Sequence, residues 1–276
     1  MKMNIKGLGR HFFKRTKGSL IEMNIKGLVF NTFKESARNK MFYLLVFFGI
    51  IFALSSKLIS FLTLGDTIKV LKDTGLAAIN FFCVLIAIFT GINLVYKEIE
   101  KKTIFNILSK PVTRDHFIIG KFFGLALTML VALIAMAGIF FILVLLVGGG
   151  FDSKILLYFF MLYLELLIIV AISLLFSSFS TPILSFIFTV SLYLIGHIMW
   201  TFNEFKSLLR SPLLEKFTQM LYYILPNLDK FNIKNEVVLG LPLRTGTILF
   251  SIFYALVYIM ALLTVTIMIF RKREFL

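Results

Sequence analysis

The strongest constraint on this chain is a series of six apolar stretches, each about as long as a membrane-spanning helix. A bilayer core of about 30 Å is crossed by roughly 20 helical residues. Transmembrane barrels show short stretches of alternating polarity instead. The long stretches therefore predict an all-α, polytopic membrane protein with six transmembrane helices, at residues 41–60, 75–95, 122–147, 155–176, 182–202 and 247–270.

The composition supports the same class. Hydrophobic residues make up 59% of the chain and charged residues only 16%, which is far from the usage of soluble domains. The single cysteine, Cys83, lies inside the second stretch, so no internal disulfide can form. We expect two parts: an arm at residues 1–40 and a six-span domain at residues 41–276.

The positions of the basic residues predict the orientation. Ten lysines and arginines lie in the arm, six in residues 96–121 and three in the tail, which is 19 of the 29 basic residues. Cytoplasmic loops carry an excess of such residues. Both termini and residues 96–121 are therefore expected on the cytoplasmic side of a cell membrane, the inner membrane of a prokaryote. The net charge of +15 fits attraction to the lipid bilayer better than a nucleic-acid partner, since no basic groove with interleaved aromatics accompanies it.

The arm contains a repeat. The sequence MNIKGL occurs at residues 3–8 and again at 23–28. We interpret residues 1–22 as a duplicated extension. The second copy has an apolar face at helical spacing and a basic opposite face, which predicts an amphipathic helix in the membrane interface. The residues that define it are Ile25, Leu28, Phe33 and Arg38.

A charged segment, residues 96–121, separates the second and third apolar stretches. Ile104 and Leu108 give it a short apolar face, and Pro111 ends that helix because proline lacks an N–H and restricts the residue before it. Thr113 and Asp115 are suited to begin the next helix. The result would be a stiff hairpin at the membrane surface. A loop that only orients the helices remains an equal alternative on this pattern alone.

The amino-acid sequence of this segment resembles the signature of a known family. The run EIEKKTIFNILSKPVTR at residues 98–114, followed by IIGKFFG at 118–124, is similar to the signature of ATP-binding-cassette (ABC) permeases of the type-2 exporter class. Shorter matches at residues 38–40, 175–179, 225–228 and 270–273 extend the resemblance from Met23 to the C-terminus. The resemblance implies a six-span permease subunit that pairs with a second copy of itself, or with a paralogous permease, and with cytoplasmic ABC ATPase subunits.

By the same resemblance, a coupling helix docks into the ATPase. Its residues would be Glu98, Glu100, Thr103, Ile104, Leu108, Pro111 and Arg114. The chain itself has no P-loop motif, so hydrolysis is expected in a separate subunit. We therefore expect no catalytic residue, metal site or cofactor in this chain, with ATP and Mg²⁺ held by the partner ATPase.

Polar residues inside the spans are the remaining candidates for a site. Glu165 is the one acidic residue in the middle of a span, where a charge is costly. It is either part of a substrate path or proton switch, or a protonated residue hydrogen-bonded to a neighbouring helix. The partners considered for that bond are Asn80, Asn93 and His197.

The last outer loop, residues 203–246, is too long for a simple turn. Apolar residues at helical spacing between Leu213 and Leu225 predict an amphipathic helix that stops at Pro226. It would act as a packing cap or as an outer gate. A channel or secondary transporter, and a membrane anchor or assembly factor, remain alternative functions. The substrate cannot be chosen from these residues.

Overall fold

A computed structural model of the chain describes residues 25–62, 66–100, 114–150, 152–205, 220 and 224–272. At residues 61–62, 95, 97–100 and 200–205 it describes the backbone only. Apart from one 3-10 turn, all regular structure in these ranges is α-helical.

Within these ranges, six helices are long and apolar enough to cross a membrane, which confirms the predicted class. They are α2 (Lys40–Leu62), α3 (Thr67–Glu100), α5 (Arg114–Leu146), α6 (Ser153–Ser177), α7 (Pro182–Phe205) and α10 (Thr245–Lys272). Residues 25–37 form a further helix, named here the N-terminal helix. The element that would join α3 to α5, residues 101–113, lies outside the described residues.

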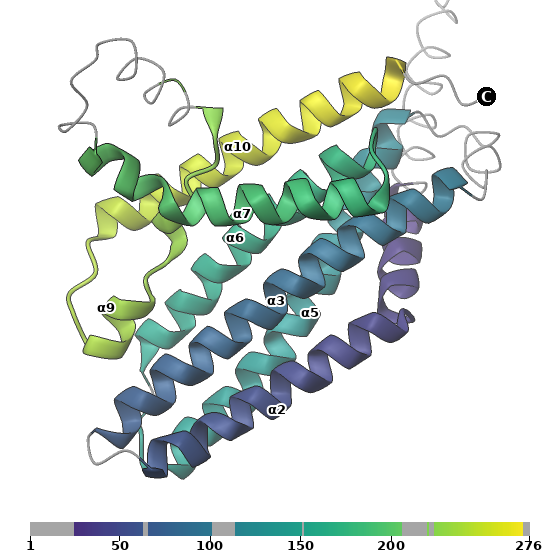
Figure 1. Cartoon of the computed structure of the whole chain (residues 1–276). Coiled ribbons are helices and arrows are strands. Elements are labelled where there is room, and N and C mark those ends of the chain that lie inside the picture. Colours follow the sequence, from purple (N-terminus) through teal and green to yellow (C-terminus); the bar gives the residue numbers. More distant parts are fainter. Residues whose placement is uncertain are drawn as a thin grey trace, which may run out of the picture.

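The bundle is built around α6 and α3 (Figure 1). In the most apolar part of α6, 72% of the residues are buried, against 17% in α10 and 22% in α7. Helix α6 packs against α3, α5, α7 and α10. The outer helices α2, α7 and α10 therefore expose most of their apolar surface, as expected where lipid or a second subunit covers them.

Small residues allow the two central helices to pack closely. A Cβ atom on Gly91 of α3 would lie 1.9 Å from the Ser173 hydroxyl of α6. Ser173 is buried, and its hydroxyl donates to the Val170 carbonyl of its own helix. Close approach through glycine and serine is how helices associate in lipid, where the hydrophobic effect does not drive them together.

Two helices start earlier than the apolar stretches predict. Helix α3 begins at Thr67 rather than at residue 75. Helix α5 begins at Arg114, before the apolar stretch at residue 122 and next to Thr113, where the sequence predicts the start of a helix. The extension of α3 carries the charges of Lys69, Lys72 and Asp73, and a search for apolar stretches does not detect such a helix. The extension of α5 is polar only in its first turn, and its Phe117, Ile118 and Lys121 are buried. At the start of α3, the Asp66 carboxylate accepts from the Lys69 backbone at 3.4 Å.

The two ends of the bundle differ. The N-terminal helix, the start of α5 and the end of α10 lie together at one end, called here the termini end. At the opposite, distal end lie the end of α2 with the start of α3, the end of α5 with the start of α6, and residues 224–244, which are called the distal cap (Figure 1).

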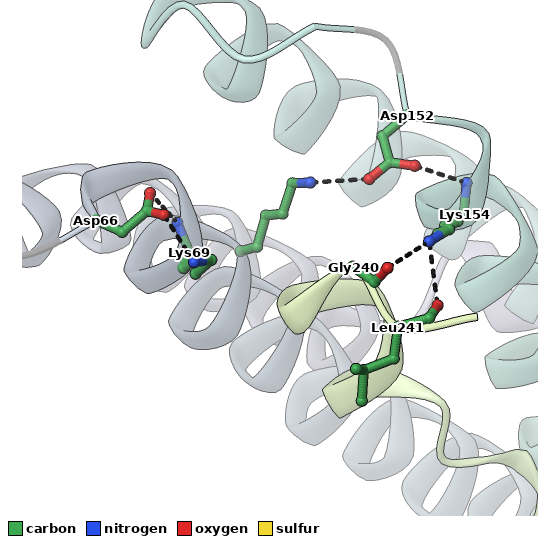
Figure 2. Close-up of polar contacts among 7 residues, drawn as sticks. Asp66, Lys69, Asp152, Lys154, Gly240 and Leu241 are labelled. Atoms are coloured by element: carbon green, nitrogen blue, oxygen red, sulfur yellow. Dashed lines mark hydrogen bonds and ion pairs between the residues drawn. The ribbon is translucent and has the colours of Figure 1, made fainter. Parts of the chain in front are cut away.

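The distal cap docks onto the helix ends through backbone and side-chain bonds. It contains the 3-10 turn η2 (Asp229–Phe231) and the short helix α9 (Lys234–Leu239), which ends at Gly240 with φ of 72°, a conformation that favours glycine. Figure 2 shows Lys154 of α6 donating to the carbonyls of Gly240 and Leu241, at 2.8 and 3.1 Å. Most of the amphipathic helix predicted at residues 213–225 lies outside the described residues.

An ion pair at this end gives a prediction about pH. Asp152 caps α6 and accepts from Lys72 of α3 at 2.8 Å. Burial raises the pKa of the Asp152 carboxyl, but the bonds from Lys72 and Lys154 outweigh it, so the pKa lies below its usual value. A depressed pKa stabilises the fold above the unfolded pKa of about 4, and that stability is lost as the pH falls through the folded pKa.

Asp152→Asn should therefore lower the melting temperature at neutral pH and flatten its decline below about pH 4. Thermal unfolding in detergent across this range measures both effects. Asp66→Asn is the control, because Asp66 pairs with Lys69 of its own helix and is exposed to solvent. An unchanged acid decline in the Asp152 variant would contradict the assignment.

Candidate functional site

The candidate site is the junction at the termini end, where three separate parts of the chain meet. The N-terminal helix packs on α5 with its predicted face inward: Thr32 and Ser36 are buried, and Ile25, Leu28 and Phe33 are half-buried. The basic residues Lys26, Lys34 and Arg38 are exposed. This arrangement follows from the 3.6-residue period of the segment.

Two glycines one helical turn apart make the contact with α5 possible. A Cβ atom on Gly124 would lie 2.4 Å from the Thr32 side chain and 2.8 Å from the Val29 carbonyl. At Gly120 the three nearest atoms all belong to the side chain of Leu28, the first at 2.4 Å. The backbone carbonyl cannot rotate away as a leucine side chain can. Gly124 therefore fixes how closely the N-terminal helix approaches α5.

Gly124→Ala is expected to loosen the N-terminal helix. Overpacking costs about 1–3 kcal/mol, so the amides of residues 25–37 should exchange roughly tenfold faster. Hydrogen exchange with mass spectrometry measures this. Gly138→Ala is the control on the same helix, because nothing lies within 4 Å of a Cβ atom there. Equal exchange in both variants would show that Gly124 does not hold the helix.

A buried lysine ties the same two elements together. Lys121 of α5 is completely buried, and its ammonium group lies 3.6 Å from the Glu35 carboxylate of the N-terminal helix. It also lies 5.6 Å from the centre of the Phe117 ring. A buried ammonium group requires such compensation, since losing its water is costly. The N-terminal helix is thus held to α5 by both shape and charge.

The end of α10 closes the junction. The rings of Phe117 and Phe270 stack with centres 5.5 Å apart, and both residues are fully buried. Arg114 donates to the carbonyls of Phe270 and Arg271, at 3.4 and 2.8 Å, and so satisfies groups that a helix end leaves open. Asp115, in the first turn of α5, pairs with the Arg271 guanidinium. The first residues of α5 are therefore joined to the end of the chain's last span.

The predicted coupling residues divide into three groups. Glu98 and Glu100 lie in the last turn of α3, where the structure describes the backbone only. Thr103, Ile104, Leu108 and Pro111 lie outside the described residues. Arg114 is described, and it faces the end of α10. The structure thus shows α3 and α5, the two helices on either side of the predicted coupling segment.

Two of the four polar residues predicted inside the spans, Glu165 and His197, are in contact. The Glu165 carboxyl of α6 lies 3.0 Å from Nε2 of His197 on α7, and the Glu165 side chain is only 2% exposed. Tyr193 packs edge-on against the His197 ring, with centres 4.7 Å apart. Glu165 and His197 therefore form a buried polar link between two spans.

The other two candidate partners of Glu165 do not join this link among the described contacts. Asn80 has a buried side-chain oxygen with no hydrogen-bond partner in the described part of the chain. Asn93 lines a polar cavity near the termini end, beside Ser36. They occupy different environments along α3.

Sequence reasoning missed Lys121, Gly120 and Gly124, although it quoted the run that contains them. Two glycines four residues apart form a GxxxG pattern, which marks a close helix contact in membrane proteins. That signal was available in IIGKFFG. The partner across the contact, the N-terminal helix, could not be read from it.

A comparison with curated proteins returned no match. A family model described as "ABC-2 family transporter protein" matches residues 24–275, which is nearly the whole chain. The matched region begins at the N-terminal helix and ends beyond α10, so it includes the entire junction and all six spans. The chain belongs to the ABC-2 family of transporter proteins and is a multi-pass membrane permease subunit of an ABC transporter.

Proposed function

We propose that this permease subunit serves an ATP-driven exporter, in which a separate cytoplasmic ATPase supplies the energy. ATP and Mg²⁺ are held by that ATPase, and the chain itself catalyses no reaction. Both termini and the coupling segment face the cytoplasm, in keeping with the 19 basic residues on that side. In a prokaryote this is the inner membrane.

The observation that carries the proposal is the junction at the termini end. The coupling segment emerges between α3 and α5, and the first turns of α5 are bonded to both the N-terminal helix and α10. A force applied to this segment therefore reaches three parts of the chain directly. Helices α3 and α5 both pack on the central α6, which passes the movement to the bundle core.

The mechanism that follows is mechanical. Closure of the ATPase pair moves the coupling segment, and α5 moves with it as a rigid element, since its start is held by packing and charge. The N-terminal helix and the end of α10 follow the start of α5. Alternating access then arises from rocking of the spans around a binding region, as packed interfaces switch between discrete arrangements.

A second subunit completes the path in this proposal. Many large apolar side chains of α2, α7 and α10 are exposed. A homodimer would bury part of this apolar surface, and lipid the rest. Pairing with a paralogous permease would use the same faces.

Photo-crosslinking tests the proposal. A photoreactive side chain at Ile104 should form an adduct with a soluble P-loop ATPase, identified by mass spectrometry. The same side chain at Leu241, which is exposed on the distal cap, is the control and should not capture that ATPase. An ATPase captured at Leu241 and not at Ile104 would contradict the proposed docking end.

A further inference from the structure

A polar cavity lies beside the junction, at the bend between the N-terminal helix and α2. Its volume is about 370 Å³. One wall comes from the end of the N-terminal helix and the start of α2, and the other from α3. The polar residues that line it include Ser36, Arg38, Asn39, Lys40, Thr90 and Asn93.

The described residues that line the cavity carry an excess of positive charge. Arg38 and Lys40 are exposed at its wall, and neither side chain forms an ion pair or hydrogen bond among the described residues. Among the described residues that line it, the one acidic residue is Glu35, which lies 3.6 Å from the Lys121 ammonium group, and this offsets its charge. Asn39 accepts from the Met41 backbone at 3.1 Å, so the start of α2, the positive end of its dipole, also lies at this wall.

A buried hydroxyl at the wall lacks a partner. Ser36 is 1% exposed, and its Oγ has no hydrogen-bond partner in the described part of the chain. A buried polar group without a partner costs free energy, and such groups in native proteins call for an explanation. A ligand with acceptor oxygens in the cavity would satisfy this hydroxyl and the two cations together.

An apolar groove adjoins the polar cavity. Its volume is about 230 Å³, and it lies between α3 and the start of α7. Asn93 lines both the cavity and the groove. The groove walls are otherwise apolar, with Phe89 and Ile92 on one side and Ile183 and Phe186 on the other. The two spaces together match a molecule with an anionic head and an apolar chain.

The depth of the cavity fits a lipid. The apolar stretches of the sequence begin at Met41 and end at Val95, and the cavity is lined by residues next to both limits. These limits mark where a hydrocarbon core gives way to headgroups. The cavity therefore lies at the level of phospholipid phosphates.

We propose that the cavity binds the phosphate headgroup of an anionic phospholipid, with an acyl chain in the groove between α3 and α7. Arg38 and Lys40 pair with the headgroup, and Ser36 donates to a phosphate oxygen. The bound lipid links the N-terminal helix to α3. This link is additional to the packing of the same helix on Gly120 and Gly124 of α5. Lipid binding in this cavity does not require transport activity.

Native mass spectrometry of the full-length chain in mild detergent tests the proposal. The probes are phosphatidylglycerol, phosphatidylcholine with the same chains, and water-soluble glycerol phosphate. The intact chain should retain phosphatidylglycerol in preference to both other probes. The double variant Arg38→Gln/Lys40→Gln should weaken its binding roughly tenfold. The control Lys26→Gln/Lys34→Gln removes the same charge from the exposed face of the N-terminal helix, and should change binding far less.

Two outcomes would overturn the proposal. Equal losses in both double variants would mean that the lipid is attracted by general charge and not held in the cavity. Retention of glycerol phosphate as strong as that of phosphatidylglycerol would assign the cavity to a soluble phosphate compound.

Ser36→Ala provides a second measurement that does not risk the fold. The hydroxyl has no partner to lose among the described residues, so the melting temperature in phosphatidylcholine should not fall. Phosphatidylglycerol should raise the melting temperature of the unaltered chain, because a ligand that binds the folded state stabilises it. In the variant this rise should be clearly smaller. A full rise in the variant would remove Ser36 from the site.

Discussion

Leu108→Asp is expected to abolish binding of the ATPase while leaving the permease folded. Leu108 lies on the short apolar face of the coupling segment, outside the described residues. A few central residues carry most of the energy of a typical interface, and loss of one of them costs about 2 kcal/mol or more. A buried carboxylate adds the cost of removing a charge from water. Recovery of the ATPase with the variant should therefore fall at least tenfold, to a trace.

The matched control is Asn106→Asp. It adds the same charge two residues away, on the face that carries Lys101 and Lys102. Size-exclusion chromatography and thermal unfolding in detergent should show both variants folded, and the control should retain the ATPase. Loss of the ATPase in both variants would indicate a general effect of charge, and retention in both would refute the docking role of Leu108.

His197→Ala is expected to destabilise the bundle strongly. The variant leaves the Glu165 carboxyl, which is only 2% exposed, without its partner at 3.0 Å. Breaking a buried pair on one side typically costs roughly 3 kcal/mol or more. The melting temperature should fall by several degrees. Glu165→Gln should have a much smaller effect, because the amide can still hydrogen bond to the imidazole.

A double variant separates the pair from the loss of the histidine ring. In the Glu165→Gln background, His197→Ala should cost less, since no carboxyl remains unpaired. Equal costs in the two backgrounds would show that the ring acts through packing against Tyr193 and not through the pair. Transport by Glu165→Gln also distinguishes the two roles of the residue: unchanged transport would exclude a proton switch.

The fold could be predicted to the level of six spans, because each span is a local property of composition. The inward face of the N-terminal helix could also be predicted, since Ile25, Leu28 and Val29 recur at helical spacing. The elements against which these faces pack could not be predicted. Arg114 bonds to a carbonyl 157 residues away, and no local pattern encodes such a pairing. A packing cap was among the predictions for residues 203–246, but its helix α9 was not predicted, because α9 is only six residues long and is held by Lys154 from another helix.

The candidate site, too, could be predicted in its local features and not in its long-range contacts. The resemblance named the coupling residues between α3 and α5, and the spacing of Gly120 and Gly124 carried a readable packing signal. The buried position of Lys121 could not be foreseen, because a lysine before an apolar stretch is ordinarily placed in water. Its burial depends on Glu35 and Phe117, which only the folded chain brings near.

The most direct test of the central claim is affinity purification of the chain from mild detergent, with mass spectrometry of the proteins that accompany it. We expect a soluble P-loop ATPase in stoichiometric amount, because in the proposed mechanism the junction at the termini end follows the motion of that ATPase. A folded homo-oligomer of the permease with no ATPase would contradict the account and would favour a channel or an anchor.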